Sequence, residues 1–233
     1  MKPNLGQYFG ALSSAKIAEG MNVAQKNAQR LLDDARLLFD NGRYPSAAAW
    51  AILSIEESGK RPILRELALA HNEKELREAW RSYRSHTKKS ALWPMLEMFS
   101  KGARRADDFG GLFDPNAEHP YILDQLKQVG IYTDCLGKAH WSVPEQVIER
   151  DLATMLLKTA EILAHGREIQ AEEIDLWIQH MQPSWKSSKE SMEKALFEWE
   201  KALRSRGLAE SSGRLEQFFK EGITPPPGPK GKQ

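Results

Sequence analysis

A chain of 233 residues is long enough to bury a hydrophobic core, and we expect one main domain with an appendage. Acidic and basic residues nearly balance, with a formal net charge of +1, so the whole-chain charge points neither to nucleic acid nor to a membrane surface. No apolar stretch reaches the roughly 18 residues of a membrane-spanning helix, and the residues after Met1 lack the pattern of a signal peptide. Cys135 is the only cysteine, which excludes an internal disulfide and favours a reducing compartment, the cytoplasm.

Hydrophobic periodicity predicts an all-α fold, an antiparallel helical bundle with no convincing strand. The expected helices cover residues 20–41, 45–70, 73–88, 92–99, 120–129, 143–167, 171–181 and 188–206. Ser142 and Glu145 have capping-box spacing for the helix over 143–167, and the Gly- and Asp-rich residues 102–119 are expected to form a loop. We expect a bundle over 1–182, accessory helices over 183–222 and a disordered Pro/Gly/Lys tail over 223–233.

The helix over 45–70 is apolar almost all round, which is typical of the central member of a bundle. At about 100° per residue, Glu56, Glu57 and Lys60 fall inside its apolar arc, with Glu56 and Lys60 one turn apart. A buried ion must be paired, protonated or used chemically. The alternative is a solvated i,i+4 pair on a helix that is less buried than expected.

A local basic patch spans Arg77 to Arg105, where eight Lys or Arg face two Glu. Such a patch is a plausible phosphate-binding footprint, and the intervening Trp80, Tyr83 and Trp93 could stack on bases. The alternative is a solvated basic helix whose aromatic residues face the core.

Within this patch, Arg81 and His86 suffice for RNA cleavage without a metal. A neutral histidine can take the proton of the ribose 2′-hydroxyl, a protonated one can give a proton to the leaving 5′-oxygen, and a guanidinium can hold the phosphate. Five residues on a straight helix separate two side chains by about 140°, so Arg81 and His86 converge only if the helix ends or bends near His86. No metal-ligand spacing and no glycine-rich phosphate loop is present, so we expect neither metal nor cofactor.

The sequence resembles a known family. The stretches at residues 35–39, 42–49 and 54–60 look like the first two helices of the AbiV-type abortive-infection proteins, of the HEPN superfamily. His86 with Lys89, and residues 130–134 ahead of Trp141, follow in the expected order. The resemblance covers roughly residues 20–170, and its most specific piece is Glu56-Glu57-Ser58-Gly59-Lys60.

The resemblance implies a four- or five-helix HEPN bundle acting in antiphage defence. Many HEPN proteins are metal-independent ribonucleases that juxtapose two Arg-x(4–6)-His motifs in a dimer. Arg81 and His86 match that spacing, although Ser82 stands where the family often has Asn, Asp or His. We therefore expect Arg81 and His86 to be catalytic, supported by Glu56, Glu57, Lys60, Arg84, Lys89 and Tyr132.

The expected function is thus a dimeric endoribonuclease toxin that binds RNA, such as tRNA or mRNA. We expect a phage protein to trigger its activity, and we expect no binding to membranes. A non-catalytic alternative is a helical binding module that senses a phage protein or host RNA through the last helix and the tail. A further alternative is a partner of a nucleotidyltransferase. Glu56, Glu57 and Lys60 either orient Arg81 or His86 or only lock the bundle packing.

Overall fold

The computed structural model describes residues 6–114, 117–209 and 214–222, and it confirms the all-α class. Two long helices, α1 (Ser14–Asp40) and α2 (Tyr44–Ser58), form a hairpin. Gly42 in the connecting turn has φ +73°, a conformation that glycine adopts without strain. The first helix begins earlier than residue 20 because the hydroxyl of Ser13 caps it, accepting a hydrogen bond from the Lys16 backbone N–H at 3.3 Å.

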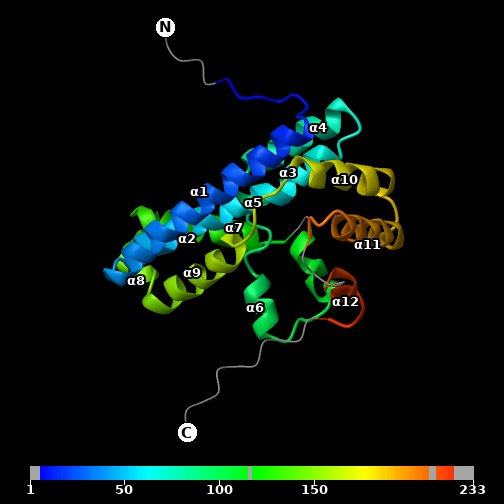
Figure 1. The fold of residues 1–233 in the computed structure, drawn as a ribbon. Coiled ribbons are helices and arrows are strands. Elements are labelled where there is room, and N and C mark those ends of the chain that lie inside the picture. The colour runs from blue at the N-terminus through cyan, green and yellow to red at the C-terminus, as the bar shows by residue number, and fades with distance from the viewer. Residues whose placement is uncertain (1–5, 115–116, 210–213, 223–233) are drawn as a thin grey trace.

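Helix α2 is the centre of the bundle. It packs against α1, α7 (His119–Ile131) and α9 (Arg150–Ala164), and Figure 1 shows α1, α2 and α9 side by side. Its Ala48, Ile52 and Ile55 are buried with Leu123 of α7 and Leu156 of α9 in the main core. Contact on nearly every side explains why α2 has no polar face.

Two predicted helices are each divided in two. The helix expected over 45–70 breaks at Gly59 into α2 and α3 (Lys60–Ala68). The helix expected over 73–88 breaks at Ser85 into α4 (Glu73–Arg84) and α5 (His86–Lys89). Ser85 is extended, with φ −77° and ψ 128°, and its hydroxyl accepts from the Lys88 backbone N–H at 3.3 Å, which starts the new helix.

The middle of the chain departs most from the predicted elements. After α6 (Met95–Ser100), the predicted loop contains a 3₁₀ helix, η1 (Ala106–Phe113). Strands β1 (Cys135–Leu136) and β2 (His140–Trp141), which the sequence did not predict, pair as a small antiparallel hairpin.

The helix predicted over 143–167 is also divided, into α8 (Pro144–Val147) and α9. The predicted capping box is wrong. Val143 is the residue before α8, and the Ser142 hydroxyl instead accepts from the Asp134 backbone N–H at 2.9 Å, which holds the hairpin ends together.

The C-terminal helices are α10 (Ala171–Met181), a short η2 (Gln182–Ser184), α11 (Lys189–Ser205) and α12 (Arg214–Lys220). Helix α10 packs against α1 and α11, with the rings of Trp177 and Trp199 4.9 Å apart. The predicted tail over 223–233 lies outside the described residues. Among the residues described, no helix is both long and apolar enough to cross a bilayer.

Candidate active site

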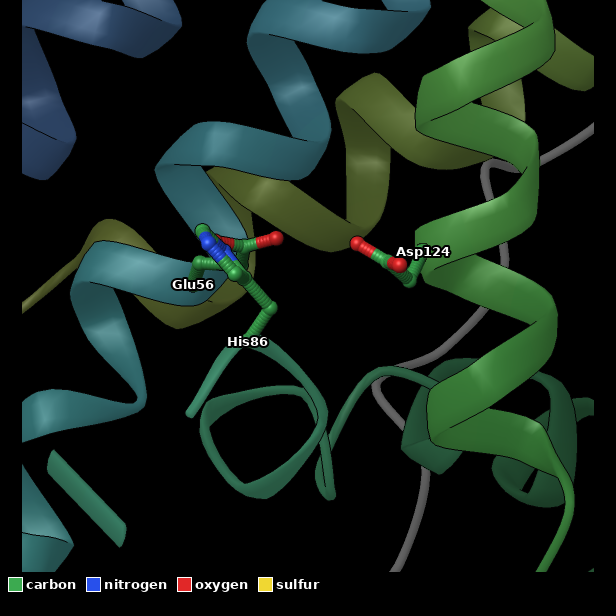
Figure 2. Close-up of side chains that lie close together, drawn as sticks. All are labelled: Glu56, His86 and Asp124. Atoms are coloured by element: carbon green, nitrogen blue, oxygen red, sulfur yellow. The ribbon is translucent and has the colours of Figure 1, made fainter. Parts of the chain in front are cut away.

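Glu56 of α2 is the hub of a buried polar cluster. The residue is only 3% exposed, and each carboxylate oxygen has its own donor. The Nδ1 of His86 lies 2.7 Å from Oε2, and the ammonium of Lys127, on α7, donates to Oε1 at 2.5 Å. Figure 2 shows the imidazole of His86 against Glu56, with Asp124 of α7 nearby. These contacts satisfy a carboxylate that would otherwise be costly to bury.

The break at Ser85 brings His86 to Glu56. Because α4 ends at Arg84 and α5 begins at His86, Arg81 and His86 do not lie on one straight helix. The separation of about 140° that a straight helix would impose on their side chains therefore does not apply. Gly59 allows the close approach of α5. A Cβ on Gly59 would overlap the carbonyl oxygen of Lys89, so the chain needs glycine there although its φ, −66°, is ordinary.

Two buried lysines neutralise Glu56. Lys127 also pairs with Asp124 at 2.9 Å, and the ammonium of Lys89 lies 3.8 Å from Glu56. Burial lowers the pKa of Lys127, but its hydrogen bonds to Glu56 and Asp124 outweigh burial and raise that pKa above the usual 10.5. Burial also lowers the pKa of Lys89, and here the pKa stays below its usual value, because the more distant carboxylate of Glu56 offsets less of the effect of burial.

Two groups face Nδ1 of His86: the Glu56 carboxylate at 2.7 Å, which accepts, and the Lys127 ammonium at 3.4 Å, which can only donate. We assign the proton to Nδ1 because the carboxylate contact is much the shorter, and Nδ1 then donates to Oε2 of Glu56. Nε2 is then the lone-pair nitrogen of the neutral ring, and no protein group among the described residues is bonded to it. The side chain is 60% exposed, so Nε2 can meet a substrate from solvent. A carboxylate-oriented imidazole of this kind can serve as general base or, once protonated, as general acid.

Glu56, His86 and Asp124 also resemble a metal-ligand set, since they offer ligand atoms within 4.8 Å of one another. However, the ammonium of Lys127 is bonded to both carboxylates. A divalent cation would have to displace this lysine, so the three residues fit an internal ammonium better than a metal ion.

The alternative of a solvated i,i+4 pair between Glu56 and Lys60 is wrong, since Glu56 is buried and Lys60 has another partner. Lys60 instead forms an ion pair with Glu57, and its ammonium lies 5.2 Å from the ring centroid of Tyr83 on α4. Lys60 of α3 thus links Glu57 of α2 to Tyr83 of α4, the helix that carries Arg81. Among the described residues, neither Glu57 nor Lys60 forms a hydrogen bond or ion pair with His86.

Three other predicted residues, Arg81, Arg84 and Tyr132, form no hydrogen bond or ion pair with the Glu56 cluster among the described residues. Arg81 is exposed on the last turn of α4, and its guanidinium has no protein partner among the described residues. Arg84 is held by the N-terminal segment, because its guanidinium donates to the Tyr8 carbonyl and lies 4.1 Å from the ring centroid of Phe9. Tyr132 is exposed just after α7, and no hydrogen bond joins it to Glu56 or His86 within the described ranges.

The two tryptophans of the basic patch belong to the protein interior. Trp80 is buried and donates to the Gly10 carbonyl at 3.0 Å, and Trp93 is buried and donates to the His119 carbonyl at 2.8 Å. The stacking role suggested for them is therefore wrong, and the core-facing alternative describes them correctly. Their indole rings anchor the segments on either side of α5.

Sequence reasoning missed Lys127 and Asp124. A signal for Lys127 was present, because Leu123, Lys127 and Gly130 lie on one buried stripe of α7 at helical spacing. A lysine on such a stripe calls for a buried partner, as Glu56 does on α2. What the sequence lacked was any indication that these two helices face each other.

The comparison with protein families identifies the bundle. A family model described as AbiV, HEPN_AbiV, matches residues 16–165. The chain belongs to the AbiV family of HEPN proteins. This family implies an abortive-infection HEPN domain, and the matched segment carries Glu56, Arg81, His86 and Lys127. Neither a comparison with curated proteins nor one with solved structures found a match.

Proposed function

We propose that this AbiV-family protein is a metal-independent endoribonuclease toxin of antiphage defence, with Arg81 and His86 as its catalytic residues. The observation that supports this proposal best is the imidazole of His86, oriented by buried Glu56 through Nδ1 while Nε2 is left for substrate. Arg81, five residues before His86 in the chain, supplies a phosphate clamp, because its exposed guanidinium has no partner among the described residues.

The reaction needs only proton transfer and charge stabilisation. Nε2 of a neutral His86 takes the proton of the 2′-hydroxyl, and the 2′-oxygen attacks the adjacent phosphorus. The bond from phosphorus to the 5′-oxygen breaks, and a protonated His86 supplies that oxygen with its proton. Arg81 opposes the charge that grows on the phosphate. The products are a 2′,3′-cyclic phosphate and a free 5′-hydroxyl.

We propose that two copies of the chain share the two proton transfers. In a twofold dimer the His86 of one subunit acts as base while the partner's His86 acts as acid, so both proton transfers occur in one turnover. Lys89 adds positive potential beside each imidazole. Glu56 and Lys127 act as positioning residues, because they reach the substrate only through His86.

The test is cleavage of cellular RNA or tRNA by the full chain in the presence of EDTA. We expect His86→Ala to lower the rate roughly 100-fold or more, the usual contribution of a general acid–base group. Arg81→Ala should lower it comparably, and the products should carry cyclic phosphate ends.

The matched control is His140→Ala, since His140 is an exposed histidine on β2. This variant should cleave as the unaltered protein does. Cleavage that continues unchanged in both His86→Ala and Arg81→Ala would remove these residues from the mechanism.

A further inference from the structure

A cleft of about 670 Å³ opens beside the His86 cluster. Its wall contains Thr87, Lys88 and Lys89, which directly follow His86, and Gly59, which follows α2. The remaining wall comes from α3, α7 and α10, from Ser82 of α4 and Leu112 of η1, and from connecting residues that include Asp114 and Trp185. The volume lies within the range of pockets that bind small organic ligands, about 300–1,000 Å³. The cleft is a feature separate from the His86 cluster, because Glu56, His86 and Lys127 do not line it.

One edge of the cleft is cationic. The side chain of Lys89 is only 8% exposed, yet its ammonium makes no hydrogen bond among the described residues, and its nearest anion is Glu56 at 3.8 Å. Lys88 lies on the same edge and is exposed. Two lysines that are neighbours in the chain give this edge a positive potential, which suits a phosphate.

Aromatic side chains also line the cleft. Tyr121, near the start of α7, is 63% exposed, so its ring is free to receive a flat partner. Trp177 of α10 is held rigidly, because its Nε1 donates to the Arg65 carbonyl at 3.1 Å and the Arg65 guanidinium lies 5.5 Å from its ring centroid. An exposed aromatic ring and a rigidly held one, together with lysines in the same cleft, suit a planar base attached to a phosphate.

We infer that this cleft binds one nucleotide of single-stranded RNA next to the scissile phosphate, with the base against Tyr121 and the adjoining phosphate on Lys88 and Lys89. The inference rests on the proposed function, since it takes RNA as the substrate. It adds a base-binding subsite that extends the site from His86 toward α7 and α10. Glu66, on the cleft wall, can accept hydrogen bonds from the amino group of a base.

The test measures binding without cleavage. The full chain is titrated with a 2′-O-methyl hexaribonucleotide, whose blocked 2′-oxygens cannot attack phosphorus, and with an abasic hexamer of the same charge. We expect the hexamer with bases to bind more tightly. Tyr121→Ala should weaken its binding roughly tenfold, in line with the loss of one stacked base, and should leave abasic binding unchanged. Tyr121→Phe should retain the affinity, because it keeps the ring.

Lys88→Ala should weaken binding of both hexamers and reduce the salt dependence of binding by about one phosphate contact. The matched controls are Trp141→Ala and Lys138→Ala, which alter exposed residues of the β1–β2 hairpin outside the cleft. Both control variants should bind as the unaltered protein does.

The outcomes separate the two proposals. Binding that depends on Tyr121 and Lys88, in a protein that does not cleave RNA, would support the subsite and reject the ribonuclease. Cleavage that depends on His86, with equal binding of both hexamers and no effect of Tyr121→Ala, would leave the ribonuclease in place and overturn the subsite.

Discussion

At the scale of single residues, the site depends on one carboxylate with several donors. Glu56 holds His86 through one oxygen and Lys127 through the other, with Lys89 at longer range. A buried charge cluster of this kind contributes less to net stability than to geometry, because desolvation offsets much of the Coulomb attraction. Losing one member is nevertheless costly, since the remaining charges stay buried.

Glu56→Gln tests this dependence. The change leaves Lys127 and Lys89 without their shared anion, and we expect the free energy of unfolding to fall by about 3–5 kcal/mol in chemical denaturation. The matched control is Glu57→Gln on the same helix, where the partly exposed pair with Lys60 should be worth about 1 kcal/mol. Adding Lys127→Met to Glu56→Gln should restore part of the loss, and equal losses in the two single variants would refute the special role of Glu56.

The raised pKa of Lys127 makes a separate prediction about alkaline pH. A folded-state pKa above 10.5 means that the protonated lysine stabilises the fold fully below about pH 10.5, and that this stability is lost as pH rises through the higher folded value. The stability advantage of the unaltered protein over Lys127→Met should therefore shrink above about pH 10.5. Denaturation curves at a series of pH values measure it, with Lys138→Met as the exposed control. An advantage that stays constant or grows would contradict this assignment.

At the scale of elements, the short helix α5 must lie against the α2–α3 junction for His86 to reach Glu56. Gly59 makes this possible, and we expect Gly59→Ala to push α5 away from α2. Overlap with the Lys89 carbonyl should cost about 1–3 kcal/mol, measured by denaturation, and should weaken RNA cleavage as His86 leaves Glu56. Gly110→Ala is the control, because a Cβ there meets no atom within 4 Å. Equal stability and activity in the two variants would show that the close approach is unimportant.

At the scale of the whole molecule, the proposed mechanism requires two copies of the chain, since a single imidazole cannot take one proton and give another in the same step. We expect the protein to sediment as a dimer in analytical ultracentrifugation. The cleavage rate per chain should fall when dilution dissociates that dimer. A monomer that keeps its full rate per chain at every concentration would rule out a site shared between subunits.

The sequence alone determined the all-α class, the α1–α2 hairpin and the central position of α2, because these follow from local periodicity and turn residues. It also marked Glu56 as a charge in an apolar arc and His86 as part of a basic helix end. Helix breaks were harder to foresee. Gly59 and Ser85 interrupt patterns that continue on either side, and the approach of α5 that requires them is a tertiary contact.

Only the tertiary structure decided which charges meet. Lys127 is 71 residues from Glu56, and its own helix shows only that it lies on a buried stripe. Lys60 is near Glu56 in the chain but turns to Glu57 and Tyr83. The cleft beside Lys89 likewise combines segments from residues 59 to 185. Periodicity shows which face of a helix is buried, whereas the partner across that face depends on how distant helices pack.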